Sequence, residues 1–207
     1  MKVLLINGSP HENGCTHTAL SAVAQALHEN DVETDWLWIG KDPHRGCVGC
    51  GSCYKKGRCV YDGDKANEVI ARMEGADGLV VGSPVYYAAP NGSLLALLDR
   101  VFYAGSTGFA HKPGAALVSA RRAGTTAALE VLNKYFTIAQ MPLVSSRYWN
   151  MVHGNTPEEV VQDLEGMQIM QQLGRNMAWL LKCIEAGKTN GIEKPGAERW
   201  ARTNFIR

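Results

Sequence analysis

Apolar residues fall into short continuous runs that alternate with longer stretches of helical spacing. The first run, "KVLLING" (2–8), is apolar throughout and ends at a glycine. The stretch 16–29 places apolar residues at 19, 20, 23, 26 and 27, which is the spacing of a helix with one buried face. Because a fully apolar run is typical of a strand buried on both sides, the pattern predicts a strand followed by a helix.

The same alternation continues to residue 186. It predicts further strands over 32–40, 77–85, 112–120 and 141–151, and further helices over 64–76, 91–105, 125–140 and 156–186. Thr156 is the expected N-cap of the last helix, with Pro157 at its first position. The repeated strand–helix unit predicts an α/β fold: a doubly wound five-stranded parallel sheet in the flavodoxin-like order 2-1-3-4-5, with helices on both faces.

This organisation predicts one domain over residues 1–186, a cysteine-rich insertion at 45–62, and a tail at 187–207. The tail carries Trp200, Phe205 and Ile206, so we expect it to dock on this chain or on a partner. The chain has 207 residues, of which 45% are hydrophobic, enough for a sizeable core. The net charge of +1 gives no electrostatic case for binding nucleic acid or an anionic membrane.

The apolar runs are too short to span a membrane. The N-terminal residues are better explained as a buried strand than as a signal peptide. We therefore expect a cytoplasmic protein whose thiols stay reduced.

Three loops are predicted at the carboxyl edge of the sheet, where open α/β sheets bind ligands. Loop 7–18 has two glycines and the hydroxyls of Ser9, Thr16 and Thr18 at a helix start, which suits a phosphate. Loop 82–93 offers Tyr86 and Tyr87, which could stack on a planar ring. The alternatives are an ordinary strand–helix turn for the first loop, and one core and one surface tyrosine for the second.

The third loop, 119–126, places Arg121 and Arg122 beside Gly124 and a helix start. Paired arginines suit an anion or the carbonyl edge of a ring, although a solvated basic turn would have the same composition. Taken together, the three loops offer a phosphate site, an aromatic wall and polar groups for a ring edge. That combination matches flavin mononucleotide (FMN).

Four of the six cysteines, Cys47, Cys50, Cys53 and Cys59, lie within "RGCVGCGSCYKKGRC" (45–59). The expected compartment disfavours disulfides, and zinc commonly takes two C-x2-C pairs separated by a longer loop. A three-residue repeat followed by a fourth cysteine suits the corners of an iron–sulfur cubane, with glycines that let the backbone wrap. Zinc and a metal-free segment stay open as alternatives. Cys183, on the last predicted helix, is expected to be a buried core thiol.

Several motifs occur in the order of a known family: "GSPHENGCT", the C-x2-C-x2-C-x5-C spacing, "GSPVYY…LLDR" and "RRAG…TIAQMPLVSSRYW". Over residues 1–154 the chain resembles the NAD(P)H-dependent FMN reductase-like flavoproteins, and within them the iron–sulfur flavoprotein branch. The resemblance implies a flavodoxin-like FMN-binding domain, a homodimer or homotetramer, and one [4Fe-4S] cluster on the four cysteines.

The resemblance also implies the binding residues. The phosphate loop would include Ser9, His11, Cys15, Thr16 and Thr18, the isoalloxazine loop Pro84, Val85, Tyr86 and Tyr87, and the ring-edge loop Arg121, Arg122 and Gly124. His11 and Cys15 depart from the family, which often has Arg or Lys and Asn at those places. Because a thiol is a weak donor, the phosphate is expected to depend more on backbone amides and Thr16.

The predicted function is an FMN-dependent oxidoreductase. It would take electrons from NAD(P)H or a reduced ferredoxin-like carrier and pass them to a quinone, a flavin or another acceptor, with the cluster as a relay. The flavin carries the chemistry, so no catalytic side chain is predicted. The alternatives are a non-enzymatic flavodoxin-type electron carrier, which is usually acidic, and a flavoprotein without a cluster.

Overall fold

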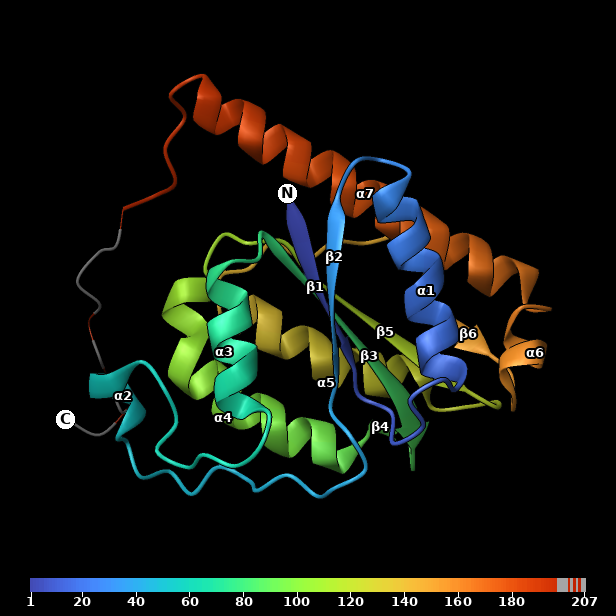
Figure 1. Cartoon of the computed structure of the whole chain (residues 1–207), viewed down its shortest axis with the longest axis horizontal. Coiled ribbons are helices and arrows are strands. Elements are labelled where there is room, and N and C mark those ends of the chain that lie inside the picture. Colours follow the sequence, from blue (N-terminus) through green and yellow to red (C-terminus); the bar gives the residue numbers. More distant parts are fainter. Residues whose placement is uncertain (197–200, 202, 204, 206–207) are drawn as a thin grey trace.

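The computed structural model describes residues 1–196, 201, 203 and 205. Five parallel strands lie in the order β2-β1-β3-β5-β6, and a short strand, β4, pairs antiparallel with β3 (Figure 1). The strands are β1 (Lys2–Asn7), β2 (Glu33–Trp38), β3 (Gly78–Tyr86), β4 (Ala89–Pro90), β5 (Gly114–Ala120) and β6 (Met151–His153). The predicted order of the parallel strands is confirmed, and β4 is an addition that the sequence pattern did not predict.

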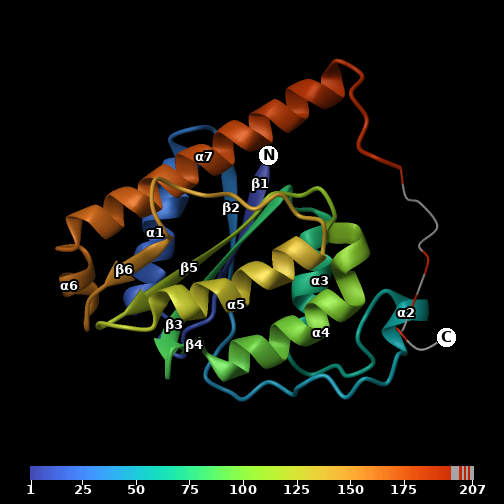
Figure 2. The same ribbon diagram turned by 180° about the vertical axis from the view of Figure 1, so that it is seen from behind.

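Helices cover both faces of the sheet, with α1 and α7 on one face and α3, α4 and α5 on the other (Figures 1 and 2). The helices are α1 (Cys15–His28), α2 (Cys53–Lys56), α3 (Ala66–Glu74), α4 (Gly92–Phe109), α5 (Thr125–Ile138), α6 (Pro157–Val160) and α7 (Leu164–Thr189). The α/β flavodoxin-like fold class is therefore confirmed.

Alternation along the buried strands builds two separate cores. In β1, Val3 and Leu5 pack under α1 and α7, whereas Leu4 and Ile6 pack under α3 and α4. All four side chains are fully buried. The continuous apolar run of β1 is thus explained by successive side chains pointing to opposite, equally covered faces.

The predicted strand over 141–151 is wrong. Leu143 forms only an isolated bridge to Gly114, and the chain then leaves the sheet until β6 begins at Met151. Within this gap the side-chain amide of Asn150 donates to the carbonyl of Ala116, and the hydroxyl of Ser146 donates to the carbonyl of Tyr148. These side chains satisfy local polar groups, so a continuous backbone ladder is not needed there.

The predicted helix over 156–186 is two helices. Thr156 caps α6 by accepting from the N–H of Glu159, with Pro157 at the first position as expected. A second cap, Asp163, accepts hydrogen bonds from the N–H groups of Gly166 and His153, and α7 begins directly after it. A capping residue can therefore end one helix and begin another within a stretch of continuous helical spacing, without a glycine or proline at the break.

Within the described part of the chain, no helix is long and apolar enough to cross a membrane. The predicted docking of the tail rests on Trp200, Phe205 and Ile206. Trp200 and Ile206 lie outside the described residues, and Phe205 is exposed. Docking of the tail stays a prediction.

Candidate functional site

A large open cavity lies at the carboxyl ends of β1, β3 and β5. Its volume is about 730 Å³, within the usual range of small-molecule sites. Of the predicted binding residues, Ser9, His11, Cys15, Thr16, Pro84, Val85, Tyr86 and Arg121 line it. All three predicted loops therefore contribute to one site.

The first loop leads into the N-terminus of α1 and holds itself in shape. The side chain of Asn7 donates to the carbonyl of Glu12 and accepts from the N–H of Ser9, whose hydroxyl accepts from the N–H of His11. Gly14 is the N-cap of α1, and no side chain caps that end. Free N–H groups in the first turn of a helix attract an anion, because they carry the positive end of the helix dipole.

Thr16 and Thr18 have different places. Thr16 is buried in the cavity wall, and its hydroxyl lies 2.8 Å from the hydroxyl of Ser119. Thr18 does not line the cavity, and its hydroxyl donates to the carbonyl of Gly14 at 3.3 Å. Of these two threonines, only Thr16 lines the cavity.

Cys15 lines the cavity beside Gly154 and contributes only a weak polar contact. Its thiol donates to the carbonyl of Gly154 at 3.8 Å. Burial raises the pKa of this thiol, and the nearby carboxylates of Glu159 and Glu158 raise it further. A neutral thiol offers little to an anion, so the backbone amides are left as the main donors of this loop.

The second loop is a tight hairpin between β3 and β4. Tyr86 pairs with Ala89, and the two residues of the turn, Tyr87 and Ala88, both have positive φ angles of 51° and 59°. Tyr86 lines the cavity, whereas Tyr87 is fully exposed at the tip, with a relative exposure of 105%. The predicted aromatic pair is thus separated by the turn.

The third loop is divided in the same way, since Arg121 lines the cavity and Arg122 does not. Gly124 lies behind the wall at a φ of +91°, where a Cβ atom would approach the Cα of Ala88 to 2.8 Å. Its role in the structure is to let the hairpin turn pack against the start of α5.

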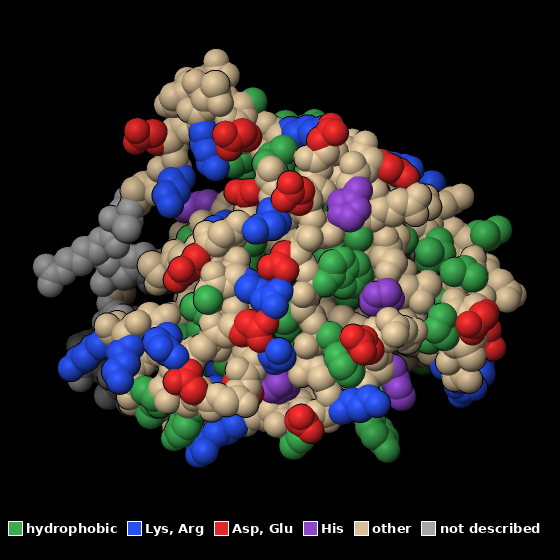
Figure 3. Space-filling model, viewed as in Figure 1, with side chains coloured by type: hydrophobic (Ala, Val, Ile, Leu, Met, Phe, Trp, Pro, Cys, Tyr) green, Lys and Arg blue, Asp and Glu red, His purple; other side chains and the backbone are tan. Residues whose placement is uncertain are grey.

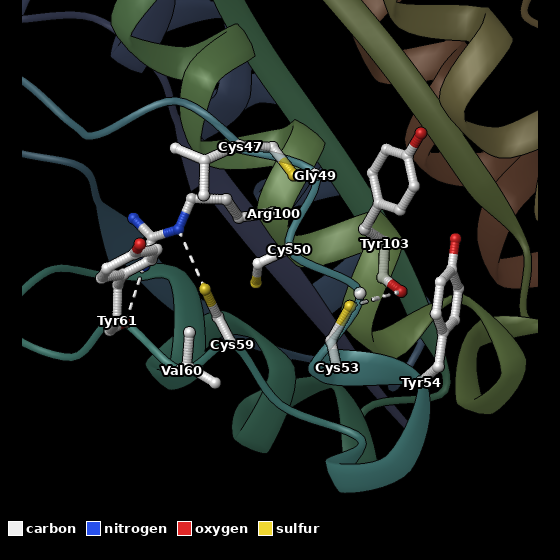
Figure 4. A pocket seen from close by; sticks show the side chains of 12 residues that line it. Cys47, Gly49, Cys50, Cys53, Tyr54, Cys59, Val60, Tyr61, Arg100 and Tyr103 are labelled. Carbon is white, nitrogen blue, oxygen red and sulfur yellow. Dashed lines mark hydrogen bonds between the residues drawn. The ribbon is translucent and has the colours of Figure 1, made fainter.

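The four cysteines of the predicted metal site line a second, smaller cavity of about 50 Å³ (Figure 4). None of them is in a disulfide. Cys53 begins α2, and its thiol donates to the carbonyl of Tyr103 on α4 at 3.6 Å. Hydrogen bonds from Ser52 lower the pKa of the Cys50 thiol, which favours the thiolate form that metals bind.

Arg100, on α4, closes one side of this cavity. Its Nε–H donates to the sulfur of Cys59 at 3.2 Å, and its side chain forms an ion pair with Asp64. Burial lowers the pKa of Arg100, but the hydrogen bonds to Asp64 and Cys59 and their charges leave it above the ordinary value. The guanidinium is therefore a permanent buried cation beside a candidate ligand.

Residues 1–156 match the sequence pattern of a family described as NADPH-dependent FMN reductase. The chain belongs to that family. Its general class is therefore that of flavin-dependent oxidoreductases. Among its curated relatives is an iron-sulfur flavoprotein of Methanocaldococcus jannaschii, which is 28% identical over 89% of this chain and the full length of the relative.

Solved structures support the same fold. RosB, in a structure with a bound 8-demethyl-8-formylriboflavin-5'-phosphate intermediate, matches with a TM-score of 0.70 and 12% identity over 100% of this chain and 94% of its own. A flavodoxin from the domain Archaea matches with a TM-score of 0.58 and 15% identity over 88% of this chain and 99% of its own.

The cavity fits the flavin that the family implies. An uncapped helix start meets the need of a phosphate, Tyr86 and Pro84 offer flat surface, and Arg121 offers N–H donors to a polar ring edge. Four of the predicted binding residues do not line the cavity: Thr18, Tyr87, Arg122 and Gly124. Tyr87 faces solvent, and Gly124 packs against the hairpin that forms part of the wall.

Sequence reasoning missed part of the wall. Trp38, at the end of β2, lines the cavity, and its indole N–H donates to the carbonyl of Ser9 at 2.8 Å. Lys41, Ser119 and the segment Gly154–Pro157 also contribute. The signal for Trp38 was present, because β2 neighbours β1 and its carboxyl end must open onto the same edge.

The arrangement of the four cysteines bears on the kind of metal group that they could hold. In the described part of the chain, no three Cys, His, Asp or Glu side chains converge on a point that could hold a metal ion. The four cysteines instead line one small cavity (Figure 4). A cubane takes its thiolates on four separate irons, so its ligands need to surround a volume rather than meet at one point.

Cys183 corrects one expectation. It is exposed on α7 rather than buried in the core, and it lies away from the other cysteines. Cys183 lies on the solvent-facing side of α7, between the buried Leu181 and the half-buried Ile184. The position of a residue around the helix, and not its type, therefore decides its exposure.

Proposed function

We propose that this chain is an FMN-dependent oxidoreductase that takes electrons from NAD(P)H or a reduced ferredoxin-like carrier and passes them to a quinone, a flavin or another acceptor. The observation that carries the proposal is the cavity at the carboxyl edge. One wall of it is an uncapped helix start, another an aromatic loop, and a third an arginine, in a chain of the FMN reductase family.

The bound flavin supplies hydride and single-electron chemistry. The chain's own residues hold and orient it. The amides of α1 would bind its phosphate, Tyr86 would cover one part of the ring, and Arg121 would donate to its polar edge. A cation at that edge stabilises negative charge on the ring, so Arg121 would favour the reduced form.

We further propose that Cys47, Cys50, Cys53 and Cys59 hold a [4Fe-4S] cluster, whose chemistry is single-electron transfer. The cavity that the four cysteines share, the lowered pKa of Cys50 and the buried cation beside Cys59 support it. The name of the methanogen relative points the same way.

The surface near the cysteine segment suits an acidic electron carrier. Lys55 and Lys56 are exposed on α2, and Arg58 follows them. Figure 3 shows Lys and Arg side chains gathered at the lower left, where Figure 1 places α2. Opposite charge on a partner would speed association. We also propose a homodimer or homotetramer in the cytoplasm, as the family resemblance implies.

The decisive experiment is purification without oxygen, followed by an absorption spectrum and by counts of flavin, iron and sulfide. We expect one flavin and about four irons per chain. Cys50→Ser should lose iron and keep flavin, whereas the matched control Cys183→Ser should keep both. Protein that lacks flavin would refute the oxidoreductase proposal, and wild type that lacks iron would leave a cluster-free flavoprotein.

The role of Arg121 is tested by comparing two variants, one at Arg121 and one at its neighbour Arg122. Arg121→Leu should make the reduction potential of bound FMN more negative, because it removes a cation from the ring edge. Arg122→Leu, which changes a neighbour outside the cavity, should leave the potential unchanged. Equal potentials in both variants would contradict the role. Turnover with NADH, NADPH and a reduced ferredoxin then distinguishes an enzyme from an electron carrier.

A further inference from the structure

Arg100 is the largest of the fully buried side chains, and its side chain is only 1% exposed. It comes from the middle of α4, in a helix face that is otherwise apolar: Leu97, Val101 and Phe102 pack into the core beside it. A buried charge is costly unless it is paired and hydrogen-bonded, so its position calls for an explanation.

The guanidinium holds the cysteine segment at both of its ends. Nη1 donates to the carbonyl of Arg45, before the first cysteine, and Nη2 donates to the carbonyl of Tyr61, after the last, at 3.3 and 2.7 Å. Nη1 also bonds to the carboxylate of Asp64, and Nε bonds to the sulfur of Cys59. The planar guanidinium group of Arg100 thus holds the backbone in place both before and after the four cysteines.

The contact with Cys59 differs from the contact made by Cys53. The thiol of Cys53 donates its hydrogen to a carbonyl, whereas the sulfur of Cys59 accepts a hydrogen bond from a cation. A neutral thiol is a weak acceptor, but a metal-bound thiolate is a strong one. The hydrogen bond from Arg100 to Cys59 is therefore strongest when that sulfur is a negatively charged metal ligand.

We propose that Arg100 is the positioning residue of the cysteine site: it fixes Cys59 and both ends of the segment, and its charge raises the reduction potential of the cluster. This inference rests on the proposed cluster. Reduction adds one negative charge to the site, and a fixed cation in hydrogen-bond contact with a ligand sulfur stabilises that added charge. Asp64 opposes this effect in part, since its carboxylate lies on the same guanidinium.

The experiment uses the full chain, loaded anaerobically with iron and sulfide. It compares Arg100→Lys and Arg100→Met with Arg58→Met, a control that removes an exposed cation paired with Asp62 on the same segment. Two quantities are measured: the potential of the cluster in a dithionite titration, and the rate of iron loss to a chelator. We expect a more negative potential in Arg100→Met and iron loss about 10–100-fold faster in both Arg100 variants. The control should match wild type.

Asp64→Asn separates charge from structure. It removes the carboxylate and leaves the guanidinium uncompensated, so the potential should shift in the positive direction, opposite to Arg100→Met. A merely structural role would move iron retention and leave the potentials of folded, loaded variants equal. Circular dichroism of each variant establishes folding, and Arg100→Lys keeps the test valid if Arg100→Met does not fold.

The outcomes distinguish the two proposals. Wild type that takes up no iron overturns the cluster and this inference together. Wild type that holds a cluster, with Arg100 variants equal to Arg58→Met in potential and in iron loss, overturns the role of Arg100 alone.

Discussion

The hydroxyl of Thr16, in the first turn of α1, lies 2.8 Å from the hydroxyl of Ser119, near the end of β5. Both residues are buried, and they join a helix start to a strand that lies 103 positions away in the sequence. Thr16→Val keeps the shape and leaves the Ser119 hydroxyl without this partner. We expect the free energy of unfolding to fall by about 1–3 kcal/mol, measured by urea denaturation.

Thr16→Ser is the matched control, because it keeps the hydroxyl and removes only a methyl group. It should retain most of the stability that Thr16→Val loses. If Thr16→Val were as stable as Thr16→Ser, the hydroxyl pair would not contribute the expected stability, because Thr16→Val keeps the methyl group that Thr16→Ser loses.

The two tyrosines of the hairpin give a second prediction. Tyr86 lines the cavity, whereas Tyr87 is fully exposed at the turn. Tyr86→Ala should weaken FMN binding about tenfold, because it removes an aromatic surface from the wall. Tyr87→Asn should leave binding unchanged, since Asn tolerates a positive φ. Flavin fluorescence titration of apoprotein measures both, and weaker binding in Tyr87→Asn alone would reverse the assignment.

Four of the five parallel strands, the strand order and the three loops could be predicted, because each depends on local patterns and on one topological rule. Which residue of a loop reaches the cavity could not, because a turn decides it. Tyr87 lies in the hairpin turn with a positive φ and is fully exposed, whereas Tyr86 lines the cavity. Of the two arginines, only Arg121 lines it. The role of Arg100 could not be predicted for another reason. Arginines are mostly exposed, and nothing in the sequence distinguishes this buried one.

Gly124 supplies a third prediction. A Cβ atom there would lie 2.8 Å from the Cα of Ala88, and its φ of +91° is unfavourable for any other residue. Gly124→Ala should displace the hairpin, destabilise the protein by about 1–3 kcal/mol and weaken FMN binding. Gly92→Ala is the control, since a Cβ at Gly92 meets no atom within 4 Å. Thermal melts with and without FMN measure both effects, and unchanged FMN binding in Gly124→Ala would refute the coupling.

The last prediction concerns acid stability. Glu68, on α3, bonds to Lys65 at 2.8 Å and to Arg72 at 2.5 Å, and Arg72 continues to Asp35 on β2. Hydrogen bonds from Lys65 and Arg72, together with their charges, hold the pKa of Glu68 below its ordinary value of 4.5, against an opposing effect of burial. A lowered pKa in the folded state stabilises the protein above the unfolded value. That contribution is lost as the pH falls through the folded value.

Glu68→Gln should therefore be less stable than wild type at pH 7, and the difference should vanish as the pH falls below 4.5. The side chains are about one-third exposed, so the difference at pH 7 should lie in the range of surface pairs, roughly 0.2–1 kcal/mol. Urea denaturation at a series of pH values measures it, and added salt should reduce it because exposed charges are screened. A difference that persists unchanged at low pH would show that the Glu68 carboxylate acts through packing rather than charge.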